Sequence, residues 1–530
     1  MDSMDKRTFL AILLTLIVLM GYQFLFTKPE PRQPLKTETR TAPETAKEGP
    51  APLARASIAP VASEPVEARD IKVETDFYIA TLTTRGGTMK DFELKKYKDP
   101  DGKGVSLLKK QGLYPPFGLG TNIDDFSISN KNFVVSGSNL NLTSGQKGSI
   151  TFEYSSPPVS VRRVYTFYGD HYRFDLKDEV SGIPEYWLSL GSDFGIHDHG
   201  ASSAPHIGPV ILKDNDRIEL DPRKLGEPKT YKDGLHWIAQ EDKYFFASIV
   251  PSGQITEAKA WKLRDSATVA FKVPSGANSV MIYAGPKEYE RLKELHVGLE
   301  HIVDFGFFSL LARPLFWILK FFYKFIGNYG WAIVLLTIMV RIPFIPLINK
   351  GQKSMKRLQE LQPRLNEMRE KYKKDPQRMQ KETMELYKKY KVNPVGGCLP
   401  MLLQIPVFFA LYKVLMISIE LRGAPFIFWI TDLSGPDTLF GHIPSWFPMI
   451  GGFAVGPLPL AMGLTMVIQQ KMTPSSADPT QAKMMMLMPI VFTFLFLNFA
   501  SGLVLYWLVN NVFGIVQQFY VNRKPSGQQT

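Results

Sequence analysis

Apolar residues are distributed unevenly along this chain of 530 residues. One long apolar run lies near the N-terminus and several more fill the C-terminal part, whereas the residues between them alternate in short stretches. A run of about 20 apolar residues is long enough for a helix to cross the hydrocarbon core of a bilayer. The C-terminal runs therefore predict five membrane spans, at about 329–349, 398–419, within 446–470, 484–499 and 502–520.

The N-terminal run extends from Phe9 to Phe26 and follows Lys6 and Arg7. As a helix it is roughly 27 Å long, close to the thickness of the hydrocarbon core. No A-x-A-like cleavage site follows it, so residues 1–27 are predicted to form an uncleaved signal anchor with its basic end in the cytoplasm. A cleaved signal peptide is the alternative.

Two contrasting segments follow the anchor. Residues 28–69 are rich in proline, alanine, threonine and glutamate and predict a flexible linker, because this composition cannot form a core. Residues 70–298 contain many short alternating stretches, such as Tyr172, Phe174 and Leu176 between charged residues. These stretches and the lack of helical periodicity predict a large antiparallel β-sandwich, placed outside the cytoplasmic membrane by the orientation of the anchor.

Residues 299–327 contain an apolar helix with three basic residues. Arg313, Lys320 and Lys324 fall within about 40° of each other at 100° per residue, on one face. A helix with one basic and one apolar face lies in the plane of the membrane interface, with its basic side chains at the headgroups. We predict such an interfacial amphipathic helix, and a true span is the alternative.

Charge supports an orientation for the remaining segment, 328–530. Residues 350–394 carry 14 Lys and Arg against 6 Asp and Glu, whereas 421–445 contain one basic residue, Arg422. By the positive-inside rule the first loop is cytoplasmic and the second lies outside, which places both termini in the cytoplasm.

The basic loop 350–394 has helical periodicity of its own, interrupted at Pro376. Apolar residues recur at spacings of three and four on both sides of this proline: Leu358, Leu361, Leu365, Met368 and Tyr372, then Met379, Thr383, Leu386 and Tyr390. This pattern predicts an antiparallel helical hairpin. Its eight excess positive charges predict a docking surface for lipid or RNA, and a solvated pair of charged helices is the alternative.

Composition and motifs argue against several other functions. The net charge of +12 suits nucleic acid or an anionic membrane, but no nucleic-acid-binding motif accompanies it. The single cysteine, Cys398, excludes an intrachain disulfide and is interpreted as a small buried residue. No nucleophile elbow, P-loop or HExxH motif occurs, so no enzyme activity and no cofactor are predicted.

One stretch, HDHGASSAPH, holds several side chains that could bind a metal: His197, Asp198, His199 and His206. Glycine and serine flank them, and no spacing defines a third ligand. We interpret this stretch as a polar loop and predict no metal site.

One charged residue lies inside a predicted span. Arg341 is ten residues after Trp331 in a run that reads AIVLLTIMVRIPFIPL, roughly 15 Å along the helix and near the bilayer midplane. Placing it in hydrocarbon costs at least about 2.5–3.5 kcal/mol. Neither 398–419 nor 484–520 contains an Asp or Glu that could pair with it.

The environment of Arg341 must therefore be polar in another way. Pro343 and Pro346 are expected to free the carbonyls of Met339 and Ile342, which then need water or protein partners. We predict a water-filled cavity on the cytoplasmic side, where the unpaired cation receives an anionic group. Polar residues predicted to line it are Thr337, Gln404, Tyr506 and Asn510. An arginine bonded to backbone carbonyls for structural reasons is the alternative.

Five segments resemble the YidC family of membrane protein insertases. The membrane core of the family resembles WAIVLLTIMVRIPFIPL, KVNPVGGCLPMLLQIPVFFALYKVL, ELRGAPFIFWITDLS and SGLVLYWLVNNVFGIVQQ, and the start of its periplasmic domain in Gram-negative bacteria is similar to TTRGGTMKDFEL. The resemblance implies a mutarotase-like β-supersandwich outside and a five-helix core with a groove open to cytoplasm and lipid. Arg341 matches the family's groove arginine, and the expected groove residues beside it are Thr337, Gln404, Phe408, Tyr506 and Asn510.

The resemblance also implies a function and partners. The expected function is to insert and help fold inner-membrane proteins, alone or with the Sec translocon, through contacts with nascent chains, SecYEG, SecDF and lipid. Because the tail NRKPSGQQT is short and weakly basic, contact with the ribosome or the signal recognition machinery is expected at loops 350–394 and 471–483. The family's groove is complete in one protomer, so a monomer is expected to function.

Two other function classes stay open. A small-molecule or ion transporter would explain an intramembrane arginine, but such proteins usually show inverted repeats, and none is found in the sequence. A membrane-anchored carbohydrate enzyme would need paired carboxylates in a cleft of the β-sandwich.

Overall fold

The computed structural model describes residues 68–99, 101–108, 114–197, 206–253, 255–264, 266–373, 375–390, 399–447, 451–472 and 479–523. All of these residues belong to one compact unit, Pro60–Thr530. The predicted signal anchor, nearly all of the predicted linker, Cys398, Asp198 and His199 lie outside the described residues.

The first part of the described chain is built from β-strands. Their bounds are β1 (Asp70–Thr75), β2 (Tyr78–Thr83), β3 (Thr88–Lys98), β4 (Gly104–Ser106), β5 (Leu119–Gly120), β6 (Val134–Ser136), β7 (Leu140–Leu142), β8 (Lys147–Ser156), β9 (Val159–Tyr168), β10 (Arg173–Ser189), β11 (Gly208–Lys213), β12 (Asp216–Glu219), β13 (Lys229–Tyr231), β14 (Leu235–Glu241), β15 (Phe245–Pro251), β16 (Glu257–Leu263) and β17 (Ser266–Pro286). A short 3₁₀ helix, η1 (Ser127–Asn130), lies between β5 and β6.

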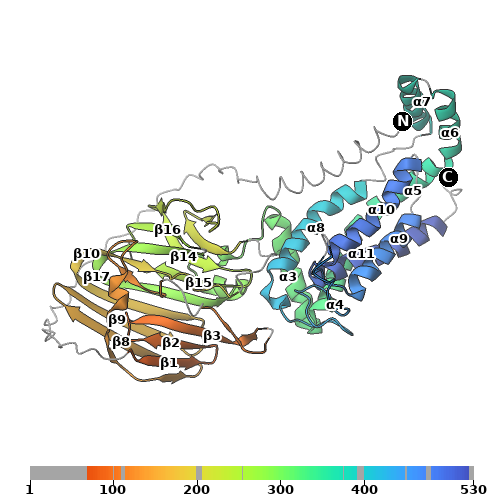
Figure 1. The fold of residues 1–530 in the computed structure, drawn as a ribbon. Coiled ribbons are helices and arrows are strands. Elements are labelled where there is room, and N and C mark those ends of the chain that lie inside the picture. Colours follow the sequence, from red (N-terminus) through yellow and green to blue (C-terminus); the bar gives the residue numbers. More distant parts are fainter. Residues whose placement is uncertain are drawn as a thin grey trace, which may run out of the picture. The chain divides into compact units, whose positions relative to one another are not determined.

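These strands form two sheets that share one apolar core (Figure 1). One sheet has the order β4-β3-β2-β1-β7. The other has the order β12-β11-β14-β15-β17-β10-β9-β8-β6, with β5 on β10 and the pair β13–β16 attached to β17. The predicted antiparallel β-sandwich is confirmed. The pairing of β1 with β7 is parallel, an exception that the sequence did not predict.

The alternating pattern positions the side chains as predicted. Tyr172, Phe174 and Leu176 are buried, and the residues between them face outward. In the register of β9 with β10, Phe174 lies opposite Phe167, so the inward side chains of both strands enter the same core. Period-two alternation alone therefore decides which face of this hairpin is buried.

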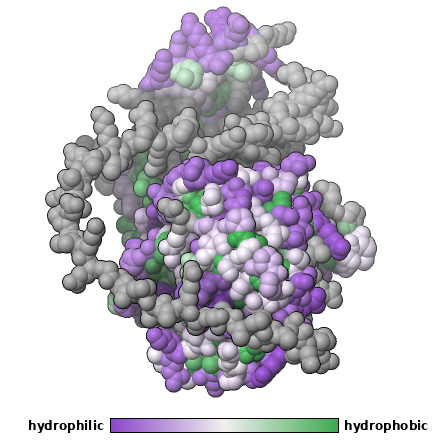
Figure 2. Space-filling model, turned by 90° about the vertical axis from the view of Figure 1, so that its left-hand side faces the viewer, coloured by the Kyte–Doolittle hydropathy of each residue, from purple (hydrophilic) through white to green (hydrophobic). Residues whose placement is uncertain are grey.

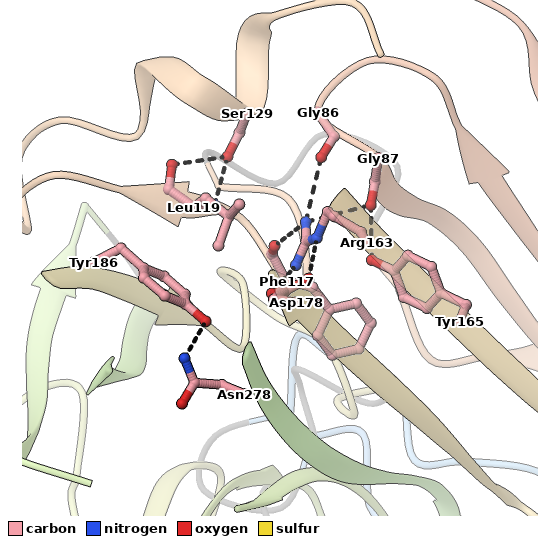
Figure 3. Close-up of polar contacts among 10 residues, drawn as sticks. All are labelled: Gly86, Gly87, Phe117, Leu119, Ser129, Arg163, Tyr165, Asp178, Tyr186 and Asn278. Atoms are coloured by element: carbon pink, nitrogen blue, oxygen red, sulfur yellow. Dashed lines mark hydrogen bonds and ion pairs between the residues drawn. The ribbon is translucent and has the colours of Figure 1, made fainter. Parts of the chain in front are cut away.

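The ion pair of Arg163 with Asp178 lies inside the sandwich (Figure 3). The Arg163 Nε donates to Asp178 Oδ1 at 2.8 Å, and its Nη2 donates to Asp178 Oδ2 at 3.0 Å. Arg163 Nη1 donates to the carbonyl of Phe117 at 2.7 Å and to the carbonyls of Gly86 and Gly87 at 3.3 Å each. Arg163 is fully buried, and these acceptors compensate the loss of water.

The glycine turn at Gly86-Gly87 makes this arrangement possible. Both residues have positive φ angles, 73° and 57°, which residues other than glycine rarely adopt. A Cβ on Gly87 would lie 3.3 Å from Cδ of Arg163. The turn between β2 and β3 thus brings two carbonyls of one sheet to the guanidinium of the other.

The second part of the described chain is helical. Its elements are α2 (Tyr289–Glu294), η2 (Leu299–Ile302), α3 (Ser309–Ile326), α4 (Tyr329–Arg341), η3 (Ile342–Phe344), α5 (Ile345–Glu360), α6 (Gln362–Lys371), α7 (Pro376–Lys389), α8 (Leu399–Ile417), η5 (Ile419–Leu421), α9 (Pro457–Met472), α10 (Pro479–Phe496) and α11 (Ser501–Arg523). Helix α11 packs against α9 and α4, α3 packs against α4 and α8, and α9 packs against α10 (Figure 1). A second apolar core lies between them.

The five predicted spans coincide with helices: α4 to α5, α8, α9, α10 and α11. Within the described residues one helical run, Tyr329–Leu358, is long and apolar enough to cross a membrane, and two shorter apolar helices cover Gln404–Ile417 and Met486–Phe496. The number of membrane crossings therefore stays a prediction.

The two parts of the chain have different surfaces. Figure 2 looks at the β-sandwich from the left-hand side of Figure 1 and shows a mainly hydrophilic face with scattered apolar side chains. Among the described residues, Val134 is the one large apolar side chain that the sandwich exposes, and all the others lie between Phe307 and Tyr520. Exposed apolar side chains in such numbers indicate that the helical part is covered by something other than water.

Helices α5, α6 and α7 form the hairpin predicted in the basic loop. Leu358, Leu361 and Leu365 are its buried core, and side chains of α7 such as Leu386 pack against them. Asp375 ends the turn by accepting a hydrogen bond from the Arg378 N–H at 3.0 Å. One detail of the prediction is wrong, because the first arm is two helices, α5 and α6, divided at Leu361. Pro363, in the first turn of α6, explains the division, since it cannot donate to the preceding turn.

Helix α3 begins at Ser309, inside the segment predicted to be an interfacial helix. One face packs on the bundle through Leu315 and Leu319. The basic residues are partly engaged by protein, since Lys320 lies 3.5 Å from Glu420 and the Arg313 guanidinium lies over the Phe305 ring. The position of α3 at the membrane interface stays a prediction.

The described histidines of the polar stretch both contact backbone carbonyls. His197 Nδ1 lies 3.1 Å from the carbonyl of Ser106, and His206 Nε2 lies 3.2 Å from that of Pro209. Within the part of the chain that the structure describes, no three His, Cys, Asp or Glu side chains gather as a metal site would require.

Candidate functional site: a polar pocket at Arg341

The pocket begins where α4 ends. Asn328 caps this helix by accepting a hydrogen bond from the Trp331 N–H at 3.1 Å, and Arg341 is the last α-helical residue. Thr337, one turn before Arg341, is buried and donates its hydroxyl to the carbonyl of Ile333 at 2.7 Å. The same face of α4 therefore carries a hydroxyl that donates its hydrogen bond within the helix and a guanidinium whose donors need acceptors from elsewhere.

The two prolines after Arg341 do not end the helical path. Residues Ile342–Phe344 form a 3₁₀ turn, and α5 continues from Ile345. The expectation that the carbonyl of Ile342 is freed is wrong, because it accepts a 3₁₀-type hydrogen bond from the Ile345 N–H. The tighter turn thus replaces the hydrogen bond that Pro346 cannot donate.

Arg341 is held by α11. Its Nη1 donates to the backbone carbonyl of Asn510 at 2.8 Å and also to the side-chain Oδ1 of Asn510. Its guanidinium lies 5.3 Å from the centre of the Phe513 ring. Arg341 is 9% exposed, and its Nε has no hydrogen-bond partner among the described residues. Part of the structural alternative is therefore realised, since one carbonyl does orient the guanidinium.

Among the described residues, no carboxylate pairs with this cation. Within the described residues none of the ion pairs includes Arg341, and its neighbours are an amide, a carbonyl and an aromatic ring. A buried arginine normally has a carboxylate or several carbonyls around it, because desolvation of the charge is costly. Arg341 retains donors that a bound anionic group could use.

A hollow of about 430 Å³, a volume that includes its open mouth, lies beside the guanidinium. Helices α4, α5, α8 and α11 and the 3₁₀ turn all contribute to its wall. The lining residues are Thr337, Val340, Arg341, Phe344, Leu347, Ile348, Gln404, Val407, Tyr506 and Asn510. The polar side chains come from three helices and the apolar ones mostly from the segment around the two prolines, so the pocket is amphipathic.

The structure brings together five of the six residues expected from the sequence: Thr337, Arg341, Gln404, Tyr506 and Asn510. The sixth, Phe408, is not part of the lining. Its ring packs edge-to-face on Trp507 at 4.9 Å and near Tyr412 at 6.3 Å, in an aromatic cluster between α8 and α11. Phe408 therefore lies in the interface between α8 and α11 and not in the pocket lining.

Sequence reasoning missed further residues on the face of α11 that meets α4 and α5. Gln517 donates to Asn349 Oδ1 at 2.7 Å, and a Cβ on Gly514 would lie 3.0 Å from Arg341 Nη2. A signal was present, because Asn510, Phe513, Gly514 and Gln517 follow the three-and-four spacing of one helix face.

Comparison with known proteins gives matches along nearly the whole chain. The family described as YidC periplasmic domain matches residues 70–318, and the family described as 60Kd inner membrane protein matches residues 321–528. A membrane protein insertase YidC of Pelobacter propionicus is 40% identical over 553 aligned positions, covering 98% of this chain and 99% of the relative. A protein of the same name from Geobacter metallireducens is 40% identical, covering 98% of both chains.

Two solved structures are similar at lower levels. A crystal structure of an active YidC insertase with its first transmembrane domain resolved is 20% identical, covers 87% of this chain and 93% of its own, and has a TM-score of 0.39. A galactose mutarotase-like protein from Lactobacillus casei is 11% identical, covers 41% of this chain and 100% of its own, and has a TM-score of 0.28. The expected mutarotase-like form of the sandwich stays a prediction.

Proposed function

The chain belongs to the YidC family of membrane protein insertases, and we propose that it inserts nascent proteins into the inner membrane by way of the pocket at Arg341. Membership makes it an inner-membrane protein with a periplasmic domain. The role of Arg341 and its neighbours, the topology and the partners are parts of the proposal.

One observation carries the proposal: a buried arginine, with no carboxylate partner in the described part of the chain, borders a hollow in a helical bundle whose outer surface is apolar. A hydrophilic tail of a substrate can enter the hollow and place an acidic residue near the guanidinium. At about 4 Å such an attraction is worth roughly 4 kcal/mol at an effective dielectric constant near 20, against about 1 kcal/mol in bulk water. The attraction offsets part of the desolvation of the carboxylate, while the apolar segment of the substrate moves sideways into lipid.

In this proposal Asn510 binds one side of the Arg341 guanidinium and the substrate binds the rest of it. The Asn510 carbonyl and amide oxygens accept from Nη1 and orient the plane, and the guanidinium, whose buried Nε has no partner among the described residues, borders the hollow that an anion would enter. Insertion needs transient binding, because the tail must also leave the pocket. A guanidinium without a permanent carboxylate partner satisfies both requirements.

The proposed topology places the β-sandwich in the periplasm and both termini in the cytoplasm. The hairpin α5–α7 then stands in the cytoplasm, where its positive charge suits contact with anionic lipid, the ribosome or the signal recognition machinery. Asp375, at the exposed turn of the hairpin, is suited to a topology test. A cysteine there, in a chain with Cys398→Ser, should react with an impermeant reagent from the cytoplasmic side alone.

Further partners are proposed from the family: SecYEG and SecDF for substrates that use both systems. A monomer is expected to suffice, because one bundle forms the whole lining of the pocket. No cofactor, metal or catalytic step enters the proposal.

The decisive experiment uses purified protein in liposomes with a single-span substrate whose translocated tail is acidic. Arg341→Ala should insert this substrate at least about tenfold more slowly, a change equivalent to about 1.4 kcal/mol, whereas Arg341→Lys should keep much of the activity because it keeps the charge. A substrate with a neutral tail should depend less on Arg341. Equal insertion of the acidic substrate by Arg341→Ala would refute the role of the arginine, and substrate-independent anion flux would favour the transporter alternative.

A further inference from the structure

The segment between α8 and α9, described over residues 418–447 and 451–456, exposes an unusual set of side chains. Phe428 is 87% exposed, Trp446 is 78% exposed and Phe440 is 62% exposed. Leu439 and Phe447 are exposed as well. This segment, which we call the α8–α9 loop, therefore presents large apolar groups at several points of its surface.

Two aspartates of the same loop, Asp437 and Asp432, are less exposed and accept hydrogen bonds from protein groups. Asp437 is 6% exposed, and its Oδ2 accepts hydrogen bonds from Trp429 Nε1 at 3.1 Å and from the Leu458 N–H at 2.9 Å. Asp432 Oδ1 accepts from the N–H groups of Gly423 and Ser434, at 3.0 and 2.8 Å. Asp437 is thus buried and Asp432 is half-buried and bonded to the loop's own backbone, whereas several rings are exposed, the reverse of what water favours.

This arrangement is held firmly on the bundle. The Ser501 and Gly502 N–H groups donate to the carbonyls of Gly435 and Leu433 at 2.7 and 2.9 Å. The Ala454 N–H donates to Asn498 Oδ1 at 3.1 Å. These bonds tie the loop to the turn between α10 and α11.

Further bonds fix the other parts of the loop. Asn328 Nδ2, at the start of α4, donates to the carbonyl of Pro425 at 3.2 Å. The bond from Leu458 to Asp437 joins the loop to the start of α9. The described parts of the loop are therefore attached to one end of the helical bundle by hydrogen bonds.

We propose that the α8–α9 loop is an interfacial anchor that inserts Phe428, Phe440 and Trp446 into the boundary between headgroups and acyl chains of the membrane. Tryptophan is enriched at this depth in membrane proteins, and interfacial segments bury tryptophan, phenylalanine and leucine side chains there. The occupant is lipid because the exposed apolar surface continues along the chain into α9, where Leu460 and Leu464 are exposed. Under the proposed topology the contacted leaflet is the periplasmic one, and this assignment alone rests on the proposed function.

Charge makes the anchor different from the basic hairpin. Residues 424–456 contain no Lys or Arg, and the guanidinium of Arg422 is engaged by the carbonyl of Lys98 at 2.9 Å. Binding by this loop should therefore depend on apolar burial and not on anionic lipid or salt.

The test uses the full chain with Cys398→Ser, in which no other cysteine remains. Trp446→Cys and, separately, Phe440→Cys carry an environment-sensitive fluorophore in phosphatidylcholine vesicles, and Ser144→Cys, on the exposed turn between β7 and β8 of the sandwich, is the control. Emission from both loop labels should shift to shorter wavelength and be quenched by lipids that carry nitroxides. The control label should be quenched by aqueous iodide instead, and adding anionic phosphatidylglycerol or salt should change neither result.

Two outcomes would overturn the proposal. Loop labels that iodide quenches and nitroxide lipids do not would show that the loop lies in water. Loop labels shielded from both quenchers would show that protein covers the surface. Either result would leave the insertion test on Arg341 unaffected, since that test does not depend on this loop.

Discussion

Two buried arginines, one in the sandwich and one in the bundle, are satisfied in different ways. Arg163 has both oxygens of Asp178 and three backbone carbonyls around its guanidinium. Arg341 has the carbonyl and amide oxygens of Asn510 and a ring, and no carboxylate among the described residues. Both side chains are nearly inaccessible, so burial does not distinguish them.

The difference shows which arginine can take part in binding. The donors of Arg163 are used by fixed acceptors from two sheets, so this residue stabilises the fold and has nothing to offer a ligand. The described acceptors around Arg341 do not fully compensate the loss of water from its guanidinium. Charged groups of this kind inside a membrane protein mark sites that bind a ligand or substrate reversibly. The contrast predicts that the two arginines respond differently to the same substitutions.

The largest effect on stability is expected for Arg163→Met. It leaves Asp178 charged and buried without its partner, which should lower the free energy of unfolding by about 3–5 kcal/mol. Chemical unfolding of the purified full chain in detergent, followed by far-ultraviolet circular dichroism, measures this change. The double variant Arg163→Met/Asp178→Leu should recover much of the loss, and a single variant as stable as the parent would contradict the role of the pair.

The matched change in the bundle, Arg341→Met, should change the free energy of unfolding by no more than about 1 kcal/mol. It removes a cation that no carboxylate of the described residues neutralises, and the described hydrogen bonds that it loses go to a single residue. The same measurement applies, combined with the insertion assay, in which acidic-tailed substrates should be inserted poorly. A loss of stability comparable to that of Arg163→Met would make Arg341 a structural residue.

Acidification should lower the stability of the sandwich, and it should not titrate the described lining of the pocket at Arg341. In the sandwich, burial alone would raise the pKa of Glu241, but Arg217 and Lys287 lower it below the usual 4.5. A carboxylate with a lowered pKa stabilises the fold above the pKa of the unfolded chain, and this contribution is lost as the pH falls through the folded value. The sandwich should therefore lose stability below about pH 4.5.

Unfolding measured as a function of pH tests this expectation. Glu241→Gln should be less stable at neutral pH, because Arg217 and Lys287 lose their partner, and its stability should fall less on acidification. A variant with the same pH slope as the parent would exclude Glu241 as the source. The pocket at Arg341 contains no carboxylate in its described lining that could titrate in this range.

The smallest effect is expected for the residue that orients Arg341. Asn510→Ala removes one side-chain acceptor and should slow insertion of acidic-tailed substrates by a few-fold, equivalent to about 0.5–1.5 kcal/mol. The matched control is Asn511→Ala, because Asn511 donates to Thr465 Oγ1 on α9 at 3.2 Å and does not contact Arg341. The control should affect acidic and neutral substrates alike, so equal selectivity of the two variants would contradict the positioning role of Asn510.

The sequence predicted the parts of the fold that depend on periodicity. The alternation at Tyr172, Phe174 and Leu176 is enough to identify a half-buried hairpin, since period two allows one buried face. In the bundle, polar residues within apolar runs had to turn away from lipid, and this requirement identified Thr337, Gln404, Tyr506 and Asn510 beside Arg341. Phe408 lies in the interface of α8 and α11 and not in the pocket lining, and the sequence could not distinguish the two places because an aromatic residue suits both.

What the sequence determined alone is therefore the identity of the segments, the faces that they bury and the presence of a cation that lipid cannot accept. Tertiary structure decided which acceptors reach each arginine. The carbonyls of Gly86 and Phe117 come from segments remote from Arg163, and Asn510 is 169 residues from Arg341. It also decided that Asp437 turns inward beneath exposed rings in the α8–α9 loop. Hydrogen bonds of this kind depend on distances between elements far apart in the chain, and local periodicity carries no information about those distances.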